Sequence, residues 1–179
     1  MKLLILDLDE TLIYATEEPL ERRADFQTEL YHVYKRPYVD EFLAFCRENF
    51  LVAVWTTAGA EFAQDVVEGV FPSDYPLQFL WSRERCSRTL NADTGERYLV
   101  KNLAKLKRKG YRLEEVLMVD DTPTKLERNY GNLIRVSEWL GDPADSELLA
   151  LMGYLVELKR VPNVRTLEKR GWQRRFRST

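Results

Sequence analysis

Short apolar runs, each followed by a polar or acidic residue, recur along the chain. The clearest cover residues 2–7, 50–55 and 116–119, and residues 133–136 show the same pattern more weakly. Continuous apolar runs of this length, without alternation, are typical of strands that are buried on both faces of a parallel sheet. We therefore predict four parallel strands at these positions.

Apolar residues at helical spacing lie between these runs. The spacing of i, i+3, i+4 and i+7 is clearest over residues 39–46, and similar spacing predicts helices over residues 61–70, 99–109 and 145–158. Strands that alternate with helices are typical of an α/β fold in which right-handed crossovers join parallel strands. The fold class that we expect is a three-layer α/β/α sandwich with a central parallel sheet.

Two stretches interrupt this alternation. Residues 26–34 are rich in aromatic and β-branched side chains, which predicts a β-hairpin flap or a small sheet. Residues 79–98 are too long for a tight connection and contain the turn signal Asp93-Thr94-Gly95, so we expect a small β-rich insert there. Because no repeat, low-complexity tract or linker is found, we interpret residues 1–179 as one domain.

The composition suits a compact globular domain. Of the 179 residues, 45% are apolar and 31% are charged, which excludes a disordered or collagen-like chain. The apolar runs are far shorter than the roughly 20 residues that cross a bilayer, and the first residues lack the usual form of a signal peptide. We therefore expect a cytoplasmic protein, or a nuclear one in a eukaryote, without membrane contacts.

Histidine and cysteine are scarce. The chain has one histidine and two cysteines, too few for a zinc site or a Ser-His-Asp triad. Two cysteines also provide no disulfide framework and suit a reducing compartment. Any catalysis would have to depend on carboxylates and lysine.

The net charge of −2 conceals a basic end. Residues 159–179 hold eight Lys or Arg and one Glu, so the rest of the chain is acidic. A basic segment can attract nucleic acid. We favour the simpler interpretation, a frayed or surface-docked end, for residues 162–179, which we call the basic tail.

The segment Asp7-Leu8-Asp9-Glu10-Thr11 follows the first predicted strand directly. Ligands bind at the carboxyl ends of strands in open α/β sheets. A spacing of two residues directs the carboxylates of Asp7 and Asp9 to one side of the chain, so that one can attack phosphorus while the other handles protons. Two anions repel a phosphate dianion, so this chemistry also requires a cation and a lysine.

Other predicted elements supply these groups. Asp120 and Asp121 follow another strand, and paired carboxylates suit Mg²⁺. Lys101, near the start of the third predicted helix, is a candidate to neutralise charge on a transferring phosphoryl group. Thr56 and Thr57 follow a further strand and offer a hydroxyl and backbone N–H groups to phosphate oxygens.

These blocks occur in an order that resembles a known family. DLDETLI, YKRPYVDEFL, VWTTAGAEFA, VKNLAKL and VDDTP are similar to motifs of the haloacid dehalogenase superfamily of phosphotransferases, and more narrowly of the small phosphatases that act on the C-terminal domain of RNA polymerase II. The similarity spans residues 3–161. It implies a Mg²⁺-dependent phosphomonoesterase that forms an aspartyl-phosphate, acting on phosphoserine or phosphothreonine in a protein or peptide.

The resemblance implies roles for individual residues. Asp7 is expected to be the nucleophile and Asp9 the general acid and base. Thr56 and Lys101 are expected to bind the phosphoryl group. The family often has a pair of small residues where this chain has Thr57-Ala58-Gly59, so the phosphate contact expected of Thr57 rests on its position after the strand. The inserted residues 79–98 stand where the family builds a small sheet beside its substrate groove.

The resemblance also implies a metal site. Asp7, the backbone carbonyl of Asp9 and the side chain of Asp121 are the expected Mg²⁺ ligands. Asp120 is expected to support Lys101, and Thr11 to fix the loop. The family often has Asp-Asn where this chain has Asp120-Asp121; the second acid adds negative charge without removing an oxygen ligand.

Two other functions stay open. A phosphatase for nucleotides or nucleic-acid ends is favoured only by the basic tail. A scaffold that keeps the fold without turnover is a second alternative, which the joint presence of Asp7, Asp9, Lys101 and Asp121 disfavours. Whichever of these functions holds, we expect the protein to be a monomer.

Overall fold

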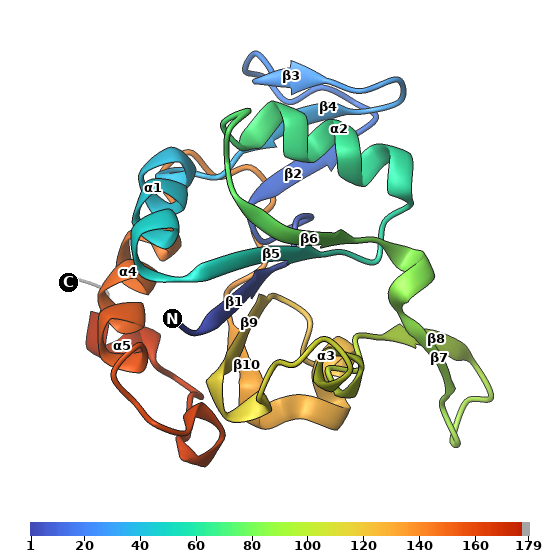
Figure 1. The fold of residues 1–179 in the computed structure, drawn as a ribbon. Helices are drawn as coiled ribbons and strands as arrows, with labels where there is room; N and C mark the ends of the chain where they lie inside the picture. The colour runs from blue at the N-terminus through green and yellow to red at the C-terminus, as the bar shows by residue number, and fades with distance from the viewer. Residues whose placement is uncertain (177–179) are drawn as a thin grey trace.

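A five-stranded parallel sheet forms the centre of the computed structural model, which describes residues 1–176 (Figure 1). The strand order is β10-β9-β1-β5-β6. The strands are β1 (Leu3–Leu6), β5 (Leu51–Trp55), β6 (Leu77–Trp81), β9 (Val116–Asp120) and β10 (Leu133–Arg135). The four predicted strands are confirmed, and β6 is a fifth strand that the apolar pattern did not indicate.

Strand β1 lies in the middle of the sheet because all four of its side chains are apolar. Leu3 pairs with Leu51 of β5 on one side and with Val116 of β9 on the other. Since these three strands are parallel, their carboxyl ends lie at one edge of the sheet. The residues that follow them, Asp7 among them, are therefore brought together.

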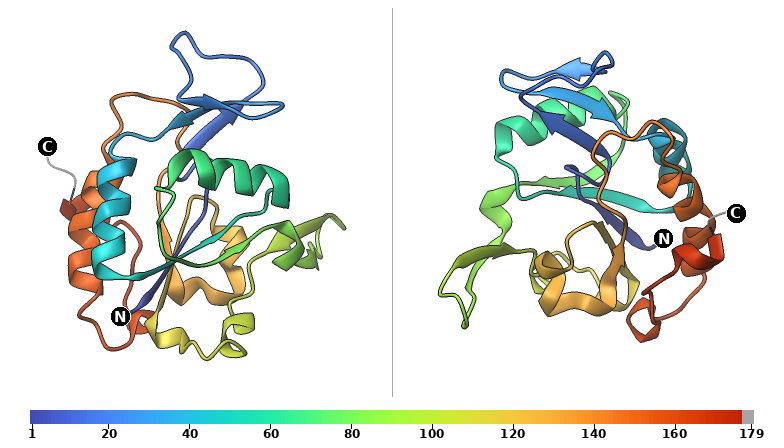
Figure 2. Two further views of the ribbon diagram at one scale, coloured as in Figure 1. Left: turned by 45° about the horizontal axis from the view of Figure 1, so that its top comes forward. Right: turned by 180° about the vertical axis from the view of Figure 1, so that it is seen from behind.

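Helices cover both faces of the sheet, so the predicted three-layer sandwich is confirmed. On one face, α1 (Val39–Asn49), α2 (Ala60–Val70) and α4 (Glu147–Leu158) pack against side chains such as Leu4 and Leu6. On the other face, Leu3 and Ile5 contact α3 (Ala104–Lys107) and the 3₁₀ segments η2 (Leu113–Glu115) and η3 (Pro123–Asn132). Figure 2 shows α1 and α4 side by side. Within the described residues, no helix is long and apolar enough to span a membrane.

The predicted helix over residues 99–109 is wrong in its first half. Arg97–Val100 form strand β8, and α3 covers only Ala104–Lys107. Leu103 and Leu106 are fully buried, as the helical spacing indicated. Leu99 instead pairs with Arg88 in a hairpin, whose backbone hydrogen bonds override the helical spacing. Lys101 therefore lies in the connection between β8 and α3.

Antiparallel strands form the flap and the insert. The flap holds β2 (Ile13–Thr16), β3 (Phe26–Gln27) and β4 (His32–Lys35) in the order β2-β4-β3, so it is the small sheet rather than a two-stranded hairpin. The insert is the hairpin of β7 (Ser87–Leu90) and β8, which projects from the body (Figure 1). Residues 79–81, predicted to open the insert, belong to β6, and the 3₁₀ turn η1 (Arg83–Arg85) follows.

The basic tail docks on the body as far as residue 176. It contains the 3₁₀ turn η4 (Val164–Thr166) and the short helix α5 (Gln173–Phe176). The Trp172 ring stacks on Tyr154 of α4 at a centroid distance of 5.3 Å, and its Nε1 donates to the Arg135 carbonyl at 2.8 Å. The surface-docked interpretation therefore applies to these residues, while residues 177–179 lie outside the described part.

Candidate active site

The Asp7 side chain lies between two lysines at the carboxyl end of β1. Its backbone N–H donates to the Val119 carbonyl at 3.0 Å, which continues the pairing with β9 beyond Leu6. Lys101 Nζ lies 2.8 Å from Asp7 Oδ1, and Lys125 Nζ donates to Oδ2 at 3.1 Å. Since Asp7 is only 1% exposed, each of its oxygens faces an ammonium group away from bulk water.

This surrounding keeps Asp7 ionised. Burial by itself would raise the pKa of the carboxyl, but the charges of Lys101 and Lys125 outweigh it, and the pKa lies below the ordinary value. Lys101 Nζ and Asp7 Oδ1 form an ion pair, but the angles at this contact are not those of a hydrogen bond. Asp7 is thus a buried carboxylate in its nucleophilic form.

Lys101 bridges Asp7 to Asp120. Its Nζ donates to Asp120 Oδ2 at 2.6 Å, and neither side chain of this pair is exposed. Asp120 Oδ1 accepts from the backbone N–H of Thr122 at 2.9 Å, which fixes the carboxylate at the end of β9. Burial and then the charge of Asp7 raise the pKa of Asp120, against the effect of Lys101. The predicted neighbours Asp7, Lys101 and Asp120 are therefore in direct contact.

Asp121 completes the acidic group. Its Oδ1 accepts from the Thr11 hydroxyl at 3.5 Å, and its Oδ2 accepts from the Thr122 hydroxyl at 2.8 Å. Thr11 is fully buried in the turn that follows Asp9. The loop after β1 is thereby tied to the loop after β9, as expected if Thr11 fixes the site.

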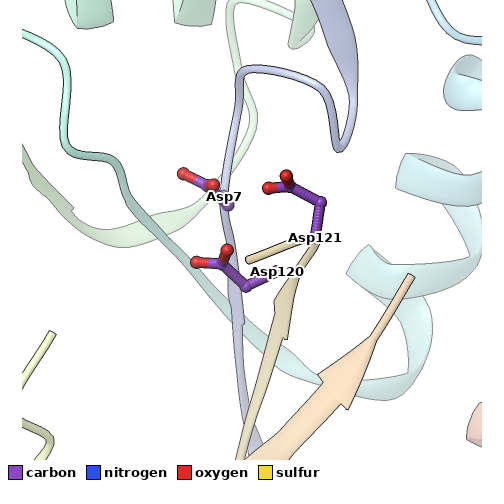
Figure 3. A group of neighbouring side chains, drawn as sticks. All are labelled: Asp7, Asp120 and Asp121. Carbon is purple, nitrogen blue, oxygen red and sulfur yellow. The ribbon is translucent and has the colours of Figure 1, made fainter. Parts of the chain in front are cut away.

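The carboxylates of Asp7, Asp120 and Asp121 converge at the ends of β1 and β9 (Figure 3). One oxygen from each lies within 4.8 Å of the others. Carboxylate oxygens are the ligands that hard divalent cations prefer. The oxygens of Asp7, Asp120 and Asp121 are therefore candidate ligands for such a cation.

Asp9 has an environment unlike that of Asp7. Its side chain is half-buried, and its backbone forms an isolated bridge with Ile13. Burial, and then the negative charge of Asp7, raise the pKa of Asp9 to about 7. A carboxyl with that pKa can hold or release a proton near neutral pH.

Thr56 and Thr57 follow β5, the strand beside β1. The Thr56 hydroxyl accepts from the Ala58 N–H at 3.1 Å and shapes the turn into α2. The Thr57 carbonyl accepts from Arg83 Nε at 2.9 Å. Among residues 1–176, no hydrogen bond joins either threonine to the acidic group, so they stand at the neighbouring strand end without direct contact.

Lys125 is a site residue that the sequence did not single out. Its Nζ lies 3.6 Å from Asp120 Oδ1 and 3.6 Å from Asp121 Oδ1, in addition to its contact with Asp7. Burial lowers the pKa of Lys125, but the three carboxylates more than compensate and raise it. The only sequence signal is the spacing of four from Asp121, which is common in solvated helical ion pairs.

Comparison with known proteins gives a family match over most of the chain. Residues 2–165 match the family described as NLI interacting factor-like phosphatase. A probable C-terminal domain small phosphatase of Dictyostelium discoideum is 30% identical over 172 residues, which is 92% of this chain and 53% of that protein. The carboxy-terminal domain RNA polymerase II polypeptide A small phosphatase 2 of Homo sapiens is 31% identical over 175 residues, 90% of this chain and 59% of that protein.

The fold also matches solved structures. A fission yeast RNA polymerase II CTD phosphatase, Fcp1, solved with beryllium fluoride, aligns with a TM-score of 0.57 at 17% identity over 92% of this chain and 52% of that one. This similarity identifies the fold as haloacid dehalogenase-like. The chain spans about half the length of the curated relatives that it matches.

Proposed function

Because the chain belongs to the NLI interacting factor-like phosphatase family, we propose that it is a phosphomonoesterase that forms an aspartyl-phosphate on Asp7. One observation carries the proposal: a carboxylate that is 1% exposed and held ionised between Lys101 and Lys125 at the carboxyl end of the central strand. The half-buried Asp9 supports it, since a second carboxyl is then available for proton transfer.

In the first step, a carboxylate oxygen of Asp7 attacks the phosphorus of a phosphate monoester. The new bond between phosphorus and Asp7 forms as the bond to the ester oxygen breaks. Asp9 donates its proton to that oxygen, which leaves as an alcohol. Lys101 holds the attacking carboxylate by its ion pair and offsets the negative charge that gathers around phosphorus.

In the second step, water attacks the phosphorus of the aspartyl-phosphate. Asp9, now ionised, accepts a proton from the water, and the bond between phosphorus and the Asp7 oxygen breaks. Inorganic phosphate leaves, and the Asp7 carboxylate and the Asp9 carboxyl are both restored. One pair of acids therefore serves both halves of the reaction, with Asp9 alternating between acid and base.

We propose Mg²⁺ as the cofactor, held by Asp7, the backbone carbonyl of Asp9 and Asp121. The oxygen donors and the hydroxyl contact from Thr11 to Asp121 support this choice. When bound, the ion offsets the charge of the phosphate oxygens. Thr56 and Thr57, at the neighbouring strand end, are proposed to contact those oxygens through a hydroxyl and backbone N–H groups.

The proposed substrate is phosphoserine or phosphothreonine in an extended protein segment. The human relative named as an RNA polymerase II carboxy-terminal domain small phosphatase supports this choice, as does the projecting β7-β8 hairpin (Figure 1). We further propose that the protein acts as a monomer in the cytoplasm, or in the nucleus of a eukaryote. Nucleotides and nucleic-acid ends remain the alternative substrates.

The experiment is a substrate panel at equal concentration: phosphopeptides, nucleotides, 5′-phosphorylated oligonucleotides and an aryl phosphate, each with Mg²⁺ and with EDTA. We expect phosphate release chiefly from phosphopeptides and its loss in EDTA. Release from nucleotides or oligonucleotides alone would overturn the substrate class. If folded protein, shown by an intact melting transition, released phosphate from none of these compounds, the proposed phosphatase activity would be overturned. A scaffold role would then be favoured.

A further inference from the structure

The two lysines on Asp7 differ in how completely they are enclosed. The Lys101 side chain is 0% exposed, and its ammonium group is held by Asp7 at 2.8 Å and by Asp120 at 2.6 Å. The Lys125 side chain is 19% exposed. Lys101 is therefore enclosed with its two carboxylates, whereas the Lys125 side chain also faces solvent.

The contacts of Lys125 are also looser. Its ammonium has one hydrogen bond, to Asp7 Oδ2 at 3.1 Å, and lies 3.6 Å from both Asp120 and Asp121. An ammonium group carries three donors, so Lys125 can contact another anion without leaving Asp7. A phosphoryl group that approaches Asp7 from the solvent side is the anion in reach.

The backbone of Lys125 is held by hydrogen bonds, although the contacts of its ammonium group are loose. Its carbonyl accepts from the Lys101 N–H at 2.7 Å, and its own N–H donates to the Thr122 carbonyl at 3.1 Å. The side chain therefore extends from a fixed backbone position to the carboxylates of the acidic group.

Lys125 also shares its carboxylates with the cation site. Asp7 and Asp121 are the proposed metal ligands, and both lie within 4 Å of its Nζ. Three carboxylates with two ammonium groups leave one negative charge in the group, and without Lys125 they would leave two. Because like charges repel strongly where water is scarce, Lys125 must weaken the binding of a divalent cation.

We propose that Lys125 is a second functional lysine, which contacts the transferring phosphoryl group and competes with the divalent cation for Asp7 and Asp121. Lys101 keeps the role proposed above, in which it orients Asp7 and offsets charge at phosphorus, and Lys125 adds a second cation from the solvent side. This inference rests on the proposed function. It predicts effects of opposite sign on anion and cation binding, which a purely structural role for Lys125 would not produce.

The test uses Lys125→Met, which keeps most of the length of the side chain and removes its charge. Calorimetry measures Mg²⁺ binding to the free protein and inorganic phosphate binding to the Mg²⁺-loaded protein. We expect Mg²⁺ to bind about tenfold more tightly and phosphate about tenfold more weakly, changes of about 1.4 kcal/mol in opposite directions. The KM for an aryl phosphate should rise with the loss of phosphate affinity.

Two further variants separate charge from packing. Lys125→Arg retains the positive charge and should leave Mg²⁺ affinity within about threefold of wild type. Lys107→Met, at an exposed position of α3 outside the site, is the matched control and should change neither affinity. If Lys125→Met shows no folded melting transition, Lys125→Gln replaces it.

Unchanged Mg²⁺ affinity, or a parallel loss of Mg²⁺ and phosphate binding, would overturn the inference. The proposed function fails separately, if the wild-type protein hydrolyses no phosphate monoester. In that case the calorimetric comparison of Mg²⁺ binding still decides whether Lys125 competes with the cation.

Discussion

The backbone N–H of Lys101 donates a 2.7 Å hydrogen bond to the carbonyl of Lys125. This bond joins the connection after β8 to the start of η3, two segments that are far apart in sequence. Because of it, both lysines approach Asp7 from fixed positions, one on each carboxylate oxygen. The charge balance of the site thus depends on tertiary pairing as well as on the motif that contains Asp7.

Replacing Lys101 with methionine should destabilise the protein. The variant leaves the buried carboxylates of Asp7 and Asp120 with only the partly exposed Lys125 as a shared cation. Breaking a buried ion pair costs about 3–5 kcal/mol. Urea unfolding measures the loss, with the exposed Lys107→Met as control. A cost below about 1 kcal/mol would show that Lys101 does not hold the two carboxylates together.

Replacing Asp9 with asparagine should slow turnover according to the leaving group. An alcohol from phosphoserine must be protonated as it leaves, whereas nitrophenolate needs little help. We expect a loss of about 10²–10⁴-fold on a phosphoserine peptide and a retained burst of nitrophenol from nitrophenyl phosphate in stopped flow. If the rate of the first step fell equally for the phosphoserine peptide and for nitrophenyl phosphate, Asp9 would not be the general acid.

Replacing Trp172 with alanine should detach the tail from α4. The variant loses the stack on Tyr154 and the bond to the Arg135 carbonyl, and loss of a buried aromatic side chain costs about 3–5 kcal/mol. Trp172→Phe should lose less in urea unfolding, since it keeps a ring. If Trp172→Ala left the free energy of unfolding unchanged, the docked tail would contribute nothing to stability.

Deleting the whole tail would therefore destabilise the protein, and a loss of activity could not be assigned to substrate binding. A groove of about 880 Å³ lies between the tail and β10, lined by Arg135, Arg165 and Arg174 among others. The double variant Arg165→Gln, Arg174→Gln, which removes two positive charges and keeps the tail, is the cleaner test. We expect phosphopeptide turnover within about twofold of wild type, whereas a selective loss on oligonucleotides would favour the alternative substrate class.

The docked tail should also loosen at high pH. Burial raises the pKa of Tyr154 from 10.0 to about 12. A raised folded-state pKa gives stability that is complete below pH 10.0 and is lost as the pH rises through about 12. The melting temperature of wild type should fall more between pH 8 and 11.5 than that of Tyr154→Phe. Parallel falls would contradict this assignment.

The sequence predicted the parts of the fold that depend on burial. Strand β1 is apolar at every position and lies in the middle of the sheet, so its pattern was clear and Asp7 could be located at its end. Strand β6 contains Gln78 and lies at the sheet edge, where partial exposure breaks up the apolar run. The Leu99 position fitted a helix and a strand alike, and only its pairing with β7 decides between them.

Part of the predicted site lies together in the structure, while the hydrogen bonds given for Thr56 and Thr57 go to Ala58 and Arg83. Asp7, Lys101, Asp120 and Asp121 come together as the ordered blocks implied. Lys125 was missed because a lysine four residues after an acid usually lies in solvent. Its role depends on how η3 turns back toward β1, which local sequence does not determine.

The most direct test of nucleophilic catalysis by Asp7 is chemical trapping of the intermediate. Protein in excess over an aryl phosphate is quenched with acid during turnover, reduced with borohydride and analysed by peptide mass spectrometry. An acyl phosphate on Asp7 would be reduced to homoserine at position 7, and Asp7→Asn should yield neither turnover nor conversion. Phosphate release by wild type with no conversion at position 7, or conversion at another carboxylate, would contradict the mechanism.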